Sequence, residues 1–153
     1  TSDSDAHVRR AAVSALAFSH MKPAAESIIR ALKDDDWMVR EMAAETLGQN
    51  QNGGLAADEL IAALGDGYWQ VRLKAVRSLG KLGVAKAVIP IGNCVTHKQS
   101  NLRKEAAAAL GEIADPAGEP FLAVIADDPD PDVRKNARWA LQRIAARKSG
   151  TLR

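Results

Sequence analysis

Side chains that commonly bind metals or act as nucleophiles are few in this sequence. It contains three histidines, His7, His20 and His97, and a single cysteine, Cys94. A metal centre needs several histidines and carboxylates that converge, but no histidine here precedes a glutamate and no two are spaced as a ligand pair. We therefore expect no catalytic residue, no metal site and no cofactor site. Cys94 can form no internal disulfide, and we expect it to be a small core residue.

The clearest binding chemistry comes from the three tryptophans, Trp37, Trp69 and Trp139. Charged or apolar side chains stand four or eight residues from each of them; Leu73 and Arg77, for example, follow Trp69 by four and eight residues. Residues with this spacing share one face of a helix. Exposed tryptophan, methionine and arginine are typical anchors of interfaces. The predicted protein-binding residues are Trp37, Met38, Glu41, Met42, Trp69, Leu73, Arg77, Lys104, Lys135 and Trp139.

An alternative reading gives the same tryptophans a structural role. Trp37 and Trp69 stand where helices are expected to begin, so they would cover turns at the edge of the core. Trp139 would cap the last unit of the chain. Both readings remain open at this stage.

The elements that position these residues come from an internal repeat. The segment VREMAAETLG, which begins at Val39, returns in altered form at Val8, Val71, Leu102 and Val133. The arginines that follow these five residues are separated by steps of 31, 32, 31 and 31 residues. A fixed period in this range indicates an α-solenoid, in which one helical unit stacks on copies of itself.

Each unit reads as two helices, and we call the one that carries the repeated arginine the second helix. Aspartates such as Asp36 favour its start, and Gly48, Gly80 and Gly111 are expected to end it. Core side chains are expected one residue before, three after and seven after the arginine. The order is one second helix followed by four pairs, which makes nine helices. We expect a single domain with repeats at about 1–21, 22–53, 54–83, 84–114 and 115–147, and a basic tail at 148–153.

The bulk composition narrows the classes of partner. The 153 residues carry a formal net charge of +2, and only 4% are aromatic. No apolar run approaches the ~20 residues that span a bilayer, so no membrane association is expected. Acidic side chains such as Glu41 and Glu45 share the predicted binding face with basic ones, which argues against a track for nucleic-acid phosphates. We expect a cytoplasmic protein.

The pattern D-x-x-VR-x-x-AA-x-ALG resembles the HEAT-like repeats of phycobilisome lyase subunits. The best copies are DDDWMVREMAAETLG and DPDPDVRKNARWAL, and the resemblance covers essentially the whole chain. It implies an all-α, right-handed α-solenoid of about five repeats, with the second helices on its concave side. It also implies a ladder between the aspartates Asp5, Asp36, Asp66 and Asp130 and the arginines Arg9, Arg40, Arg72, Arg103 and Arg134.

Related repeats occur in proteins with several activities, so the resemblance leaves alternatives. Deoxyhypusine hydroxylase uses His-Glu pairs for a di-iron centre, and this sequence has none. A bilin lyase or chaperone subunit is one alternative, and a nucleic-acid-binding protein is another. The favoured hypothesis is a non-catalytic scaffold that binds a protein or peptide on its concave face. Pairing of two copies through an uncapped first unit is a further expectation.

Overall fold

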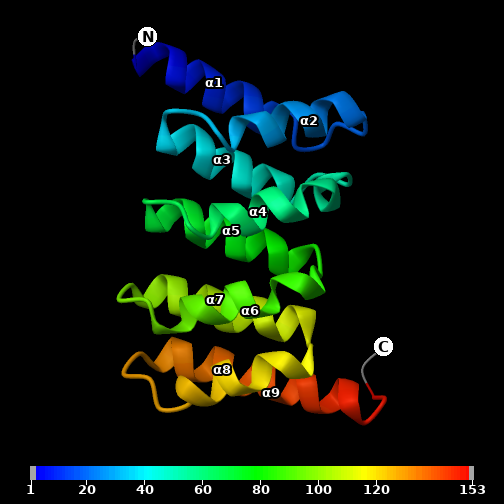
Figure 1. The fold of residues 1–153 in the computed structure, drawn as a ribbon, viewed down its shortest axis with the longest axis vertical. Helices are drawn as coiled ribbons and strands as arrows, with labels where there is room; N and C mark the ends of the chain where they lie inside the picture. The colour runs from blue at the N-terminus through cyan, green and yellow to red at the C-terminus, as the bar shows by residue number, and fades with distance from the viewer. Residues whose placement is uncertain (1–2, 152–153) are drawn as a thin grey trace. The chain divides into compact units, whose positions relative to one another are not determined.

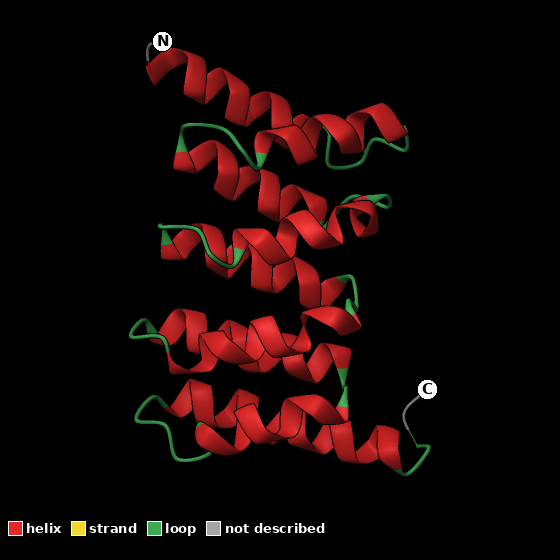
Figure 2. Cartoon of the chain, in the orientation of Figure 1, coloured by secondary structure: helices red, strands yellow, loops and turns green. Residues whose placement is uncertain are grey.

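The computed structural model describes residues 3–151, and side chains from Asp5 onward. Leu152 and Arg153, the end of the predicted basic tail, lie outside the described residues. Within the described range every regular element is a helix, and the nine predicted α-helices are present (Figures 1 and 2). The predicted α-solenoid is confirmed.

The first of two compact units spans residues 1–82. Its elements are α1 (Asp3–Ala15), α2 (Lys22–Ala31), α3 (Trp37–Leu47), η1 (Gly53–Ala56), α4 (Ala57–Ala63) and α5 (Trp69–Lys81). The second helices α1, α3 and α5 pack on one another in series, while α2 packs on α3 and α4 on α5. Unit 1 therefore has two layers, one of second helices and one of first helices.

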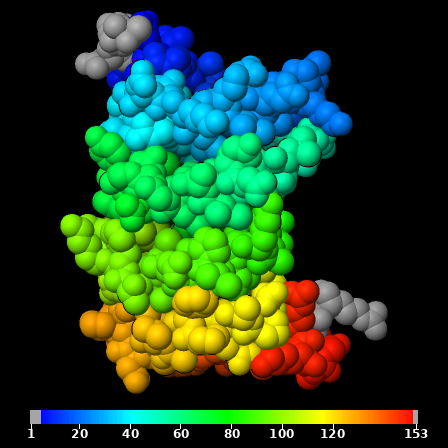
Figure 3. Space-filling view, viewed as in Figure 1, coloured from blue at the N-terminus to red at the C-terminus, as the bar shows by residue number. Residues whose placement is uncertain are grey.

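The second unit spans residues 83–153. Its elements are η2 (Ala85–Ala87), α6 (Val88–Gly92), η3 (Asn93–Thr96), α7 (Ser100–Ile113), η4 (Pro116–Gly118), α8 (Glu119–Val124) and α9 (Pro131–Lys148). The second helices α7 and α9 pack together, with α6 and η3 against α7 and α8 against α9. Within each unit, side chains fill the spaces between neighbouring ribbons (Figure 3).

The three predicted core positions are all buried in α3, α5 and α7, and two of the three are buried in α9. In α3, for example, Val39, Ala43 and Leu47 are at most 1% exposed, and α5 and α7 show the same values. Leu141 in α9 is only half-buried. These side chains remove apolar surface from water, which is the main source of stability in such a stack.

Helix α1 departs from this pattern. Val8 is 67% exposed, Ala12 is exposed and Leu16 is half-buried, whereas Ala6, Val13 and Ala17 are buried. The reason is that α3 and α5 each have a first helix over these positions, and no described helix covers them in α1. The prediction of core positions is therefore wrong for this repeat.

The ladder between arginines and aspartates is present, and Asp66 belongs to it as predicted, but Asp34 and Asp128 stand in place of the predicted Asp36 and Asp130. Asp34, Asp66 and Asp128, which we call the ladder aspartates, pair with Arg9, Arg40 and Arg103 of the preceding repeat. Each of these three arginines donates through Nε and Nη2 to both carboxylate oxygens, at 2.7 to 3.2 Å. Asp36 and Asp130 instead cap α3 and α9, where their side chains accept backbone N–H groups.

These pairs set the pKa values of the ladder aspartates. Hydrogen bonds from Arg9 and Arg103 lower the pKa of Asp34 and of Asp128 below the ordinary value. Burial raises the pKa of Asp66, but the bonds from Arg40 and from the Tyr68 N–H lower it by more. All three carboxylates are therefore held in the charged form in the folded protein.

Of the glycines that were predicted to end second helices, Gly48 does so, since it is the C-cap of α3, but Gly80 and Gly111 do not. Helix α5 continues past Gly80 to Lys81, and α7 continues past Gly111 to Ile113. A Cβ on Gly111 would overlap the Trp139 ring and lie 2.9 Å from the Cα of Ala140. The expected ends at Gly80 and Gly111 are therefore wrong, and at Gly111 the missing side chain lets α9 approach α7.

No helix in residues 3–151 is long and apolar enough to cross a membrane.

Candidate protein-binding surface

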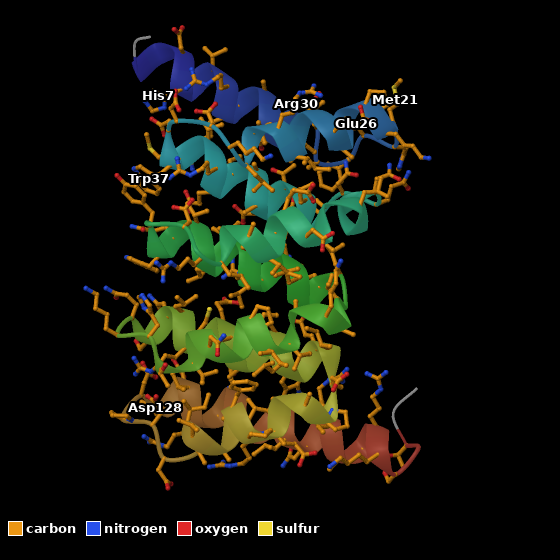
Figure 4. All side chains as sticks on the ribbon, in the orientation of Figure 1. His7, Met21, Glu26, Arg30, Trp37 and Asp128 are labelled. Carbon is orange, nitrogen blue, oxygen red and sulfur yellow. The ribbon has the colours of Figure 1, made fainter. Side chains whose placement is uncertain are left out.

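The predicted anchor in unit 1 begins at the turn before α3. Asp36 caps this helix by accepting from the Met38 N–H at 2.8 Å, which places Trp37 at its first position. The Trp37 ring stacks on Tyr68, with ring centroids 5.1 Å apart and planes 10° apart. Trp37 lies at the end of unit 1 opposite Met21 (Figure 4). The stack leaves Trp37 half-buried and Tyr68 46% exposed.

The other apolar residues of this predicted anchor share the same intermediate burial. Met38 and Met42 on α3, and Trp69 and Leu73 on α5, are all half-buried. Because α3 and α5 pack side by side, their stripes lie on the same layer of unit 1. The residues predicted from the sequence to form this anchor are thus neither buried in the core nor fully exposed.

Charged side chains frame these apolar residues. Lys74 forms an ion pair with Glu45 at 3.0 Å. Glu41 and Arg77, which are close to these residues in the sequence, are half-buried. Arg10 holds the equivalent stripe position on α1, and its Nε is buried with no hydrogen-bond acceptor among the described residues. A buried donor without an acceptor costs free energy, so an acceptor from a ligand would be favourable there.

Unit 2 holds the remaining predicted residues. Lys104 on α7 is half-buried, and its carbonyl accepts from the Asn136 side chain at 3.1 Å. Lys135 is exposed on α9. Trp139 is 40% exposed, covers Gly111 of α7, and has the Arg143 guanidinium 5.1 Å from its ring centroid. Trp139 thus combines a packing role with an exposed face.

Cys94 and His97, which were considered as reactive or metal-binding residues, contribute to packing and to a turn. Cys94 is 8% exposed and its thiol lies 3.8 Å from the Pro90 carbonyl, as expected for a small core residue. His97 occupies the place of a ladder aspartate, and its Nδ1 accepts from the Gln99 N–H at 3.1 Å. The described part of the chain contains no group of three histidine, cysteine or acidic side chains that could hold a metal.

A cavity that the sequence did not predict opens between α2 and α4. Its volume is about 380 Å³, and its lining residues are Leu32, Lys33, Asp58, Glu59, Ala62, Ala63, Gly65 and Asp66. They belong to the layer of first helices and the adjoining turns, away from the predicted stripe. No motif marks them, because a cavity between two helices depends on their packing and not on a local pattern.

Comparisons with known proteins agree with this architecture. A family model of HEAT repeats matches residues 1–57 and again residues 57–142. The complex of CpcE and CpcF of phycocyanin lyase from Nostoc sp. PCC7120 is 30% identical over 82% of this chain and 55% of that one, with a TM-score of 0.72. A search of curated protein sequences finds no significant match.

Two further solved structures share the fold. Human deoxyhypusine hydroxylase, in complex with glycerol, is 28% identical over 79% of this chain and 43% of that one, with a TM-score of 0.64. A designed armadillo repeat protein in complex with the peptide (KR)4 is 20% identical over 80% of this chain and 64% of that one, with a TM-score of 0.67. The chain thus spans between 43% and 64% of the length of these relatives.

Proposed function

Because the chain belongs to the HEAT-repeat family, we propose that it is a non-catalytic scaffold that binds a protein or peptide through the face of its second helices. One observation carries the proposal. Trp37, Met38, Met42, Trp69 and Leu73 are all half-buried on the layer of α3 and α5. Large apolar side chains that remain partly exposed on one face are the usual anchors of interfaces.

The charged residues of the second helices supply specificity. In unit 1, Glu41 and Glu45 lie on α3 and Arg77 on α5, and unit 2 separately carries Lys104 on α7 and Lys135 on α9. Such a distribution of charge would orient a partner and would reject partners of the wrong sign. The unsatisfied Nε of Arg10 adds one donor for a backbone or side-chain oxygen of the partner.

The test uses a peptide library of known composition, displayed on phage and selected on the immobilised chain. Selected peptides are then measured by calorimetry against Leu73→Glu, which places a charge within the anchor. The matched control is Leu55→Glu, since Leu55 is 61% exposed on η1 and lies outside the stripe. We expect at least tenfold weaker binding for Leu73→Glu and no change for Leu55→Glu. Equal weakening by both variants, or by neither, would refute the proposed face.

The similarity to phycocyanin lyase supports a second candidate, a subunit that binds a linear tetrapyrrole. An apolar face with basic side chains such as Arg77 could hold the rings and the propionates of a bilin. Titration of biliverdin should then shift its red absorption band in a saturable way. An unchanged band at a large excess of protein would exclude this candidate.

We also propose that two copies of the chain pair through α1. The face of α1 presents Val8, Ala11, Ala12 and Ala15 to solvent, and Phe18, just beyond it, is 81% exposed. The small alanines would let two such helices approach closely about a two-fold axis. Sedimentation equilibrium should show a dimer that Ala12→Arg abolishes. A monomer at all concentrations up to about 0.5 mM, where even weak complexes form, would contradict the pairing.

A further inference from the structure

The cavity between α2 and α4 has no part in the function proposed above. It lies within unit 1, and its volume is about 380 Å³. The lining residues come from the turn after α2, from α4 and from the turn after α4. They belong to the layer of first helices, whereas the predicted anchor lies on the layer of second helices. A ligand of this cavity would therefore bind independently of a partner on the anchor.

Small side chains on α4 leave the cavity open. Ten and nine residues before the repeated arginine, α4 has Ala62 and Ala63, whereas the corresponding residues at the end of α8 are Val124 and Ile125. Ile125 is 3% exposed, so the repeat can bury a whole aliphatic side chain at this position. In unit 2, η3 also packs on α8, but α2 and α4 of unit 1 make few contacts with each other. Unit 1 therefore has space for an aliphatic chain that its own residues do not fill.

The lining combines an apolar wall with acidic side chains. Leu32 is 8% exposed, and together with the two alanines it offers apolar surface. Three other lining residues, Asp58, Glu59 and Asp66, are acidic, and one, Lys33, is basic. At neutral pH the balance of these four charges is negative, which attracts a cation and repels an anion. The lining therefore suits a ligand with an aliphatic chain and a positively charged end.

The carboxylate of Glu59 is the one that can pair with such a ligand. Asp66 already accepts from Arg40 and from the Tyr68 N–H, and Asp58 has an interaction of its own. Glu59 is half-buried, and its carboxylate has no hydrogen-bond or ion-pair partner among the residues from Asp5 to Thr151. A partly buried charge without a partner is unfavourable, so a cation beside Glu59 would be stabilising.

We propose that this cavity binds a lysine side chain of a partner protein. The aliphatic chain of the lysine would contact Leu32 and Ala63, and its ammonium group would form an ion pair with Glu59. Ala62 and Gly65 line the cavity and are exposed, so the cavity reaches the surface and the backbone of the partner can remain outside it. The recognised element is thus a single exposed lysine.

The direct test compares two peptides that differ only in charge. The probe is an acetylated and amidated tripeptide with lysine between two glycines, and the control peptide has norleucine in place of the lysine. Binding is followed by NMR of the labelled methyl groups of Leu32, Ala62 and Ala63, with Leu55 as the reference because it is 61% exposed on η1 and does not line the cavity. We expect saturable shifts of the cavity methyl signals at millimolar peptide, at least fivefold weaker binding of the control peptide, and little shift of Leu55.

Variants separate the ion pair from the fit of the aliphatic chain. Glu59→Gln should weaken binding of the lysine peptide at least fivefold, whereas the matched control Glu26→Gln removes an exposed charge of α2 outside the lining and should not. Ala63→Ile places in unit 1 the side chain that unit 2 buries there, so it should abolish binding. Lys33→Gln should leave binding unchanged or make it tighter.

Several outcomes would overturn the proposal. These are unmoved cavity methyl signals, equal binding of the two peptides, and weaker binding to Lys33→Gln, which would indicate an anionic ligand group. The wild-type comparison of the two peptides stands alone if a variant proves unstable. Tighter binding of pentylamine than of the lysine peptide would also overturn it, since the ligand would then be a free amine and not a protein side chain.

Discussion

Replacement of Asp128 by alanine tests how strongly one repeat is held to the next. The Asp128 side chain is 6% exposed and accepts from Arg103 Nε at 2.8 Å and Nη2 at 2.9 Å. Removing one partner of a buried ion pair costs about 3–5 kcal/mol, because the other charge is left without compensation. Arg103 keeps its bonds to the carbonyls of His97 and Lys98 and is 15% exposed. We therefore expect a loss near the lower limit, about 3 kcal/mol.

The measurement is urea unfolding followed by circular dichroism. Asp127→Ala is the matched control, because it makes the same change one residue away on an exposed side chain, and it should alter the free energy of unfolding by no more than about 0.5 kcal/mol. The double variant with Arg103→Ala should cost less than the sum of the two single variants, which identifies the pair as the cause. If Asp128→Ala and Asp127→Ala were equally mild, the ladder would not be a source of stability.

Other predictions address pH, close packing and the core. The ladder aspartates have lowered pKa values in the folded state, so their stabilisation is present above the unfolded pKa of about 4 and is lost as the pH falls through the folded values. Acid unfolding should be less steep in Asp128→Ala, and an identical slope would contradict this. Gly111→Ala should destabilise by about 1–3 kcal/mol through overlap with α9, whereas Gly54→Ala, which meets no atom within 4 Å, should not. Leu79→Ala should cost about 2–5 kcal/mol and Leu55→Ala little, as thermal unfolding can show, because only Leu79 is buried.

The fold was predictable because the repeat constrains every unit at once. Five copies with nearly one spacing predict the number of helices and the buried face of the second helices α3, α5 and α7, though not that of α1. The ladder partners Asp34 and Asp128 were missed by two residues, because DDD and DPDPD each contain both a ladder aspartate and a capping one. The turn before α5 has a single acid, Asp66, six residues before its arginine, and this spacing identifies Asp34 and Asp128 in the other turns.

For the candidate surface, the sequence could predict only which face of each second helix its residues share. The sequence placed Trp37 and Trp69 on one stripe, but it could not reveal that Tyr68 stacks on Trp37, since this contact joins residues of different repeats. The exposure of Val8 was also missed, because a local pattern gives the face of a helix and not whether another helix covers it.

The matching ladder pairs of unit 1 have a consequence for how such chains change length. Arg9 and Arg40 each meet the next aspartate through the same two donors, so the junction after Arg9 is chemically interchangeable with the junction after Arg40. Deletion or duplication of one block of 31 or 32 residues would therefore rebuild the same contact at the new boundary, with Arg9 meeting Asp66 in place of Asp34. Recombination between repeats can thus lengthen or shorten this protein in whole units, without the compensating substitutions that a globular core would demand.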